Sequence, residues 1–190
     1  MRVLSKLALF ATLTLTLTPT LSAEDNKAEA KGASETLKIA KDQLTIVTPE
    51  NWKSVPPKSN FLLHEFRVPA EGKDFARITF SISGGSIKQN IERWIAQFDS
   101  ASKVESSTDK KDIAGGEVHL VDISGTYKES MGGGPFAPGP VKKLENHRLL
   151  GAIIVLKDGT QVFVKGTGPS AIMEENKDAF NKMIENVKIN

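Results

Sequence analysis

Two apolar segments joined by a tight turn constrain the fold of this chain more than any other feature. Residues 149–156 form a nearly unbroken apolar segment, Asp158-Gly159 follows, and residues 161–164 are again mostly apolar. An Asp-Gly pair between two such segments favours a β-hairpin, because the turn that matches strand twist requires positive φ at both central residues. We expect this hairpin to lie at the middle of a sheet.

Period-two alternation predicts further strands around the hairpin. Apolar and polar residues alternate in segments 62–68 and 76–83, as they do in strands that bury one face. Segments 44–47, 110–113 and 118–124 are shorter candidate strands. The chain therefore predicts a half-buried antiparallel sheet.

Two segments have helical periodicity. In residues 86–98 the apolar side chains fall on one helix face with Trp94 at its centre, so we expect Trp94 to anchor the core. Ser86 and Gln89 form a capping-box pattern at the start of this helix. A second apolar stripe in residues 170–186 predicts a helix that packs across the sheet and closes an α+β fold.

The first 35 residues lack the composition of a packed domain. Residues 1–23 have a basic start, an apolar stretch too short to span a bilayer, and small residues before Ala23, which is the pattern of a cleaved signal peptide. Residues 24–35 contain no apolar side chain larger than alanine and predict a flexible tether. We expect one folded domain over residues 36–190, exported to the periplasm or the extracellular side of a bacterial envelope.

Composition excludes several classes of function. The chain has no cysteine, which removes disulfides, thiol nucleophiles and thiolate metal sites, and export without cysteine favours a bacterial envelope. Basic residues number 25 and acidic residues 23, but Arg2 and Lys6 lie in the predicted signal peptide. The mature domain would be neutral overall and would have no field to attract nucleic acid, so we expect no nucleic-acid partner.

The chain contains no motif that identifies a catalytic, cofactor or metal site. His64, His119 and His147 have no metal-ligand spacing, and no serine lies in a Gly-x-Ser-x-Gly context. We therefore nominate no catalytic residue, cofactor or metal ligand. The alternative is a metal-dependent or hydrolytic enzyme whose site is assembled from separate strands, with the histidines converging on carboxylates in one pocket.

Four residues are candidate contacts with a partner. Arg67 and Arg77 lie on the polar faces of their predicted strands. Phe136 is an aromatic residue within the Gly/Pro-rich segment 131–140, which predicts a long loop. Trp52 is the fourth candidate, although we expect it to hold a turn onto the sheet and treat an exposed contact as its alternative role.

Three stretches resemble one known superfamily. Residues 44–52 (LTIVTPENW), 90–98 (NIERWIAQF) and 148–169, which begins RLLGAI and ends FVKGTGP, resemble small exported bacterial proteins of the PsbP-like superfamily. The resemblance implies an α/β/α sandwich, with a central antiparallel sheet and helices on both faces. Its members mostly act as non-catalytic binding or accessory subunits. The resemblance therefore implies such a role in the bacterial envelope, with an envelope protein as partner.

Overall fold

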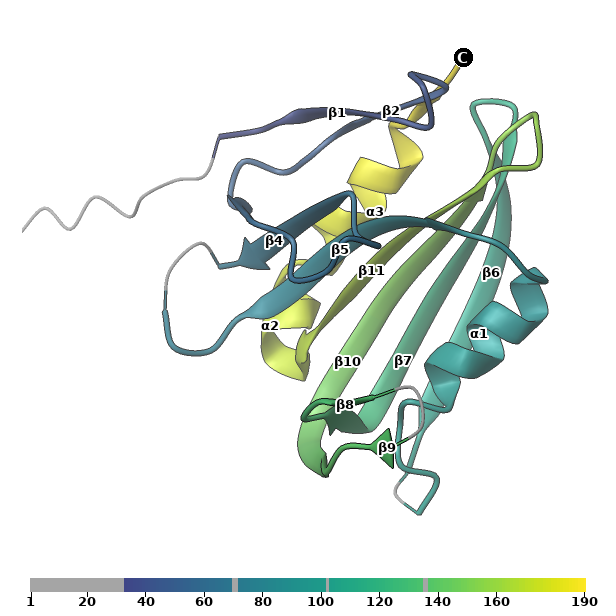
Figure 1. Ribbon diagram of the computed structural model, residues 1–190. Coiled ribbons are helices and arrows are strands. Elements are labelled where there is room, and N and C mark those ends of the chain that lie inside the picture. Colours follow the sequence, from purple (N-terminus) through teal and green to yellow (C-terminus); the bar gives the residue numbers. More distant parts are fainter. Residues whose placement is uncertain (1–32, 70–71, 102, 135–136) are drawn as a thin grey trace, which may run out of the picture.

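A seven-stranded antiparallel sheet forms the centre of the protein (Figure 1). The computed structural model describes residues 33–69, 72–101, 103–134 and 137–190. In spatial order the strands are β3 (Lys53–Val55), β4 (His64–Val68), β5 (Ala76–Ser83), β11 (Gln161–Pro169), β10 (Val141–Val155), β7 (Gly116–Ser130) and β6 (Glu105–Ile113). The large antiparallel sheet expected from the sequence is therefore confirmed.

The predicted hairpin is β10–β11, and it lies at the middle of the sheet. Its turn differs from the predicted one, because only Gly159 has positive φ, at 84°. The Gly159 amide donates to the Leu156 carbonyl, and the Leu156 amide donates to the Thr160 carbonyl. This is a three-residue loop with glycine in the left-handed position, which also matches the twist of the strands.

A second, smaller sheet contains the two ends of the described chain. It consists of β1 (Thr36–Ile39), β2 (Leu44–Val47) and β12 (Lys188–Ile189), in the order β1-β2-β12. Only β2 was predicted from sequence, as segment 44–47. The Gly/Pro-rich segment predicted as a loop contains a short pair of strands, β8 (Gly133–Gly134) and β9 (Ala137–Pro138).

Three short helices occur among the described residues: α1 (Ile87–Ile95), α2 (Ser170–Glu175) and α3 (Lys177–Glu185). The predicted start of the first helix is confirmed, because Ser86 Oγ accepts a hydrogen bond of 3.2 Å from the Gln89 amide. The single helix expected over 170–186 is instead two. Asn176 separates them, and its Nδ2 donates to the Ile172 carbonyl, a local bond that competes with regular helix geometry. Within the described chain, no helix has the length and apolar character needed to cross a membrane.

The Ser86 cap gives a direct test of this helix start. Ser86→Ala leaves the Gln89 amide without its side-chain acceptor and should lower the free energy of unfolding by about 1 kcal/mol. Ser83→Ala is the matched control, because Ser83 is exposed and lies outside the helix. Urea unfolding of both variants measures the difference, and equal midpoints would show that the cap does not stabilise α1.

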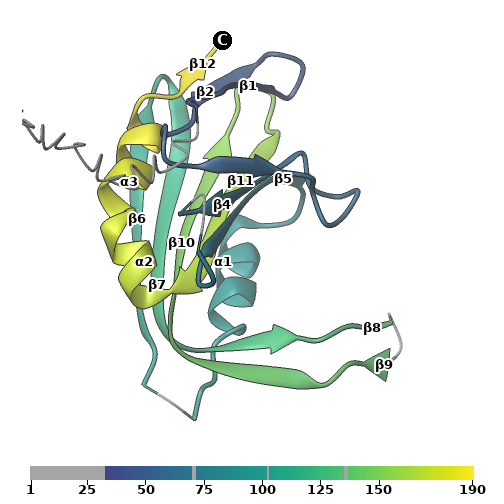
Figure 2. The same cartoon turned by 90° about the vertical axis from the view of Figure 1, so that its left-hand side faces the viewer.

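Alternation along β10 and β11 produces two hydrophobic clusters, one on each side of the sheet. Leu149 and Ile153 belong to the smaller cluster together with Trp94 of α1, which confirms Trp94 as a core residue. Leu150 and Ile154 belong to the larger cluster, which also includes residues of α2, α3, β1 and β2. Figure 2 shows α1 and the α2–α3 pair on opposite sides of these strands. Helix α1 is only nine residues long, and its Trp94 packs against Phe163 of β11, so α1 covers only part of its face (Figure 1).

Candidate functional site

Polar side chains occupy the part of the sheet beside α1. Thr79 on β5 is paired with Glu65 on β4 and with Lys165 on β11. Arg77 on β5 is paired with Arg67 on β4. Directly paired residues of antiparallel strands place their side chains on the same face. We call these five residues the polar face.

An ion pair organises the polar face. Arg77 donates twice to Glu65, from Nε to Oε1 at 2.6 Å and from Nη2 to Oε2 at 2.9 Å. The Lys58 amide also donates to Glu65 Oε2 at 2.9 Å. Only 3% of the Glu65 side chain is exposed, against 34% of Arg77. The hydrogen bonds from Arg77 outweigh burial and hold the pKa of the Glu65 carboxyl below its usual range, so the carboxylate is ionised at neutral pH.

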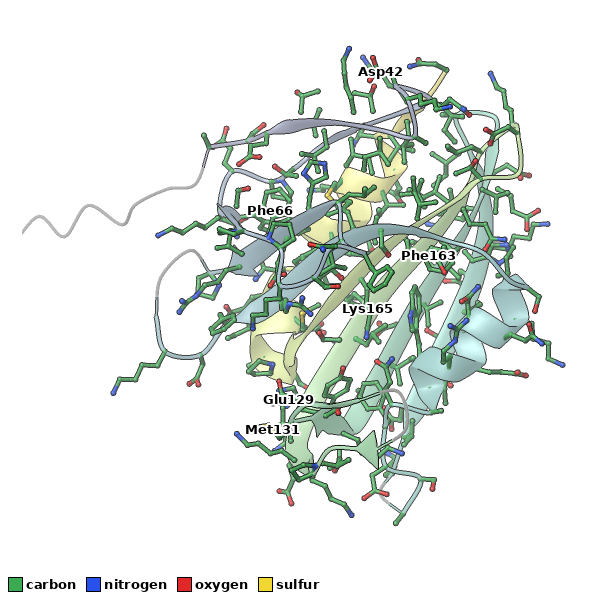
Figure 3. The ribbon with its side chains drawn as sticks, in the orientation of Figure 1. Asp42, Phe66, Glu129, Met131, Phe163 and Lys165 are labelled. Atoms are coloured by element: carbon green, nitrogen blue, oxygen red, sulfur yellow. The ribbon has the colours of Figure 1, made fainter. Side chains whose placement is uncertain are left out.

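Lys165 lies on the central strand, and its environment differs from that of Arg77. Its Nζ donates to Gln97 Oε1 at 2.5 Å and lies 5.8 Å from the centre of the Tyr127 ring. Among the described residues, no carboxylate oxygen lies within ion-pair distance of this nitrogen. Burial, with a smaller contribution from the Arg77 charge, lowers the pKa of Lys165 to about 8. In Figure 3, Lys165 follows Phe163 along the same face of β11.

A bent hairpin arm brings an aromatic ring to Lys165. Strands β7 and β10 continue past the rest of the sheet, and their register shifts between Leu144 and His147. Asn146, inside this bulge, has a positive φ of 51°. Bulges bend and twist the strand that carries them, and the arm turns toward the side on which α1 lies (Figure 2).

Tyr127 on this arm completes the surroundings of Lys165. Its ring packs edge-on against Phe98, with centroids 5.5 Å apart, and stacks on His147 at 6.3 Å. Its hydroxyl donates to Gln97 Oε1 at 3.3 Å, so one amide oxygen accepts from both Tyr127 and Lys165. Burial raises the pKa of Tyr127 above its usual value, which keeps the hydroxyl protonated as a donor.

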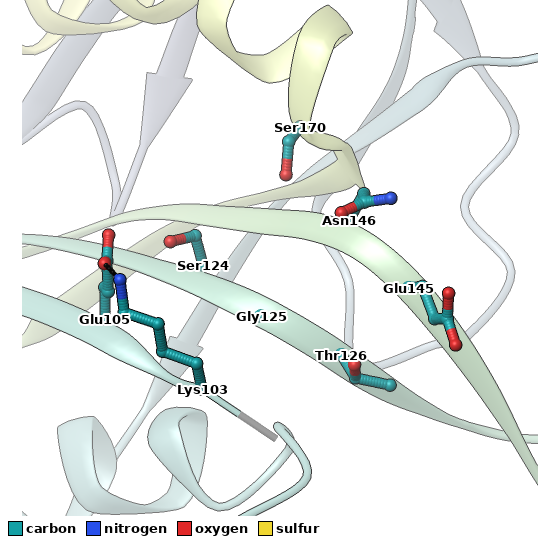
Figure 4. Close-up of a pocket in the computed structure, with 8 residues that line it drawn as sticks. All are labelled: Lys103, Glu105, Ser124, Gly125, Thr126, Glu145, Asn146 and Ser170. Atoms are coloured by element: carbon teal, nitrogen blue, oxygen red, sulfur yellow. Dashed lines mark ion pairs between the residues drawn. The ribbon is translucent and has the colours of Figure 1, made fainter.

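A polar pocket of about 360 Å³ lies at the same bulge (Figure 4). Its lining includes Ser124, Asn146 and Ser170. Of its charged lining residues, Lys103 and Glu105 form an exposed ion pair of 2.5 Å, and Glu145 is exposed to solvent. The pocket therefore presents no desolvated charge, and the polar face is the stronger candidate site.

The fold is also found in solved structures. The solution structure of cyanobacterial PsbP (CyanoP) from Synechocystis sp. PCC 6803 matches with a TM-score of 0.54 and 13% identity, over 84% of this chain and 94% of that one. This chain has a PsbP-like fold. The crystal structure of LpqN, involved in cell envelope biogenesis of Mycobacterium tuberculosis, matches with a TM-score of 0.52 and 12% identity, over 83% and 90%. No family model and no curated protein matches the sequence.

Two of the four predicted contact residues lie together in the structure. Arg67 and Arg77 lie together on the polar face. Arg67 also donates to the Gly72 carbonyl, and its guanidinium lies 4.1 Å from the centre of the Phe75 ring. Phe136 lies outside the described residues, so its predicted contact remains a prediction.

The alternative role of Trp52 as an exposed contact is wrong. Its side chain is 1% exposed and packs against Phe66, with ring centroids 6.0 Å apart. A tryptophan in this position fixes the segment before β3 onto the larger hydrophobic cluster, which is the role that we expected for it.

The histidines lie on three different strands of the PsbP-like sheet. His64 packs edge-on against Phe80, His119 is 2.5 Å from Glu117, and His147 stacks on Tyr127. In the part of the chain that the structure describes, no three His, Asp or Glu side chains are grouped to hold a metal ion.

Sequence reasoning missed Lys165 altogether. The signal was a single lysine directly after the apolar residues 162–164 of a central strand. Its neighbours Gln97 and Tyr127 are 68 and 38 positions away in the sequence, and neither lies in a segment that suggested a site. Only the register of the sheet and the bend of the arm bring them together.

Proposed function

We propose that this protein is a non-catalytic binding or accessory module of the bacterial cell envelope, and that the polar face contacts its partner. The observation that carries the proposal is a set of partly buried charges on a region of the sheet that α1 leaves open. The predicted signal peptide supports export. The shared fold with LpqN, which is involved in cell envelope biogenesis, supports the envelope as its place of action.

The charge of the polar face indicates the chemistry of the partner. Arg67, Arg77 and Lys165 contribute three positive charges, and Glu65 contributes one negative charge that is already paired with Arg77. Complementary charge gives an interface its specificity and its association rate. We therefore expect an exported protein that presents acidic side chains to this face.

Capture from an envelope extract tests this proposal. The protein is expressed from the full-length sequence with a C-terminal tag, as wild type, as Arg67→Glu and as the control Lys188→Glu. Lys188 is exposed on β12 in the smaller sheet, away from the polar face. Charge reversal at Arg67 should weaken binding of an acidic partner by at least about tenfold, because like charges at an interface repel.

The proposal requires one protein to be captured in stoichiometric amount by the wild type and by Lys188→Glu but not by Arg67→Glu. Equal melting temperatures of the two variants would exclude misfolding as the cause. Equal capture by all three forms, or no captured protein at all, would contradict it.

A further inference from the structure

Hydrogen-bond donors exceed acceptors around Lys165. An ammonium group has three N–H donors, and the structure gives Lys165 one acceptor, Gln97 Oε1. The same oxygen also accepts from the Tyr127 hydroxyl, so it has no further capacity. Arg77, the neighbouring cation, already has its carboxylate in Glu65. Two N–H groups of Lys165 thus lack an acceptor among the described residues.

Water can accept these two hydrogen bonds, but it cannot compensate the charge. A cation removed from bulk water and placed near a second cation is unfavourable unless an anion accompanies it. The lowered pKa of Lys165 reflects this cost, with burial as its main cause and Arg77 as the second. An anionic group at this position would supply both the missing acceptors and the missing charge.

The net charge of the cluster selects the kind of anion. Arg67 lies on β4, which β5 separates from β11, and the Arg77–Glu65 pair is neutral, so the uncompensated positive charge at this position is the one on Lys165. A carboxylate has one negative charge and two acceptor oxygens, which matches one ammonium with two unused N–H groups. A phosphate dianion would leave a negative charge unpaired in the same place.

We infer that Lys165 is a ligand-binding residue that receives a carboxylate group, positioned by Gln97 and by the Tyr127 ring. This inference rests on the proposed function, because it specifies what the polar face binds. The carboxylate belongs either to a free small molecule or to an acidic side chain of a partner protein. The chemistry at Lys165 is the same in both cases.

Lysine-labelled protein provides the test for a free carboxylate. The full-length protein is expressed with lysine carrying ¹³C at Cε, and the Lys165 resonance is identified by its loss in Lys165→Gln. Titration with sodium acetate, at an ionic strength held constant with sodium chloride, should shift this resonance saturably. Bound carboxylate should raise the apparent pKa of Lys165 by about one unit, as a nearby opposite charge does. Lys157→Gln, at an exposed lysine in the β10–β11 turn, should leave the response unchanged.

Capture from envelope extract provides the test for a carboxylate on a partner protein. The wild type, Lys165→Gln and the control Lys157→Gln are compared. A saturable acetate shift supports a free carboxylate ligand. Loss of a captured partner in Lys165→Gln alone supports an acidic side chain. No acetate response, with a partner that Lys165→Gln retains but Arg67→Glu loses, would overturn the inference and leave the proposed function intact. An acetate response with no captured protein would support the inference and contradict a protein partner.

Discussion

Gly151→Ala should lower the free energy of unfolding by about 3 kcal/mol. Gly151 lies on β10, paired with Val121 of β7 and Lys165 of β11, so its backbone is held on both sides. A Cβ atom added at this position would lie 2.3 Å from Cζ3 of Trp94 and 2.9 Å from its Cε3. The buried indole ring packs against Phe163, with centroids 5.9 Å apart, and has little room to move. Urea unfolding at neutral pH measures the loss.

A control and a double variant separate the clash from other effects of alanine. Gly84→Ala should be nearly neutral, because no heavy atom lies within 4 Å of an added Cβ there. In a Trp94→Leu background the same change at Gly151 should cost much less, since the ring it would strike is gone. Additive effects of Trp94→Leu and Gly151→Ala would show that the ring is not the obstacle.

Features that depend on near neighbours in sequence were predictable. The β10–β11 hairpin follows from two apolar segments around Asp158-Gly159, and the start of α1 follows from Ser86 and Gln89 three residues apart. The smaller sheet was only partly predictable. Strand β12 is two residues long and is defined by its pairing with β2, more than 140 positions earlier. So short a segment has no periodicity of its own to detect.

Only part of the candidate site was predictable, again because sequence patterns reveal near neighbours along the chain and not the packing of distant segments. Alternation placed Arg67 and Arg77 on a polar strand face, and pairing of β4 with β5 brings them together. Trp52 was named as a contact candidate because exposure depends on what packs over a side chain, and Phe66, which packs against Trp52, lies 14 positions further along the chain. Lys165 gains its character from groups on α1's C-terminal side and on β7, which sequence order cannot bring together.

Arg77→Met should lower the free energy of unfolding by about 3 kcal/mol near pH 7. This is the lower end of the range for breaking a buried ion pair, because the Arg77 side chain is 34% exposed. The change leaves the Glu65 carboxylate without its guanidinium, in a position where only 3% of the side chain is exposed. The Lys58 amide alone would remain as its donor among the described residues. Breaking one side of such a pair costs more than removing both, because the remaining charge stays desolvated. Glu65→Leu/Arg77→Met should therefore recover most of the lost stability.

The pH dependence of this cost distinguishes charge from packing. In the wild type the pKa of Glu65 lies below its ordinary value of 4.5, so its stabilising contribution is present above pH 4.5 and is lost as pH falls through the folded pKa. Without Arg77, burial dominates and raises the pKa of Glu65 above 4.5, so the variant loses stability as pH rises. Urea unfolding from pH 4 to pH 7 should show a gap between the two proteins that widens toward pH 7. A gap of constant size would mean that the aliphatic part of Arg77, and not its charge, stabilises the polar face.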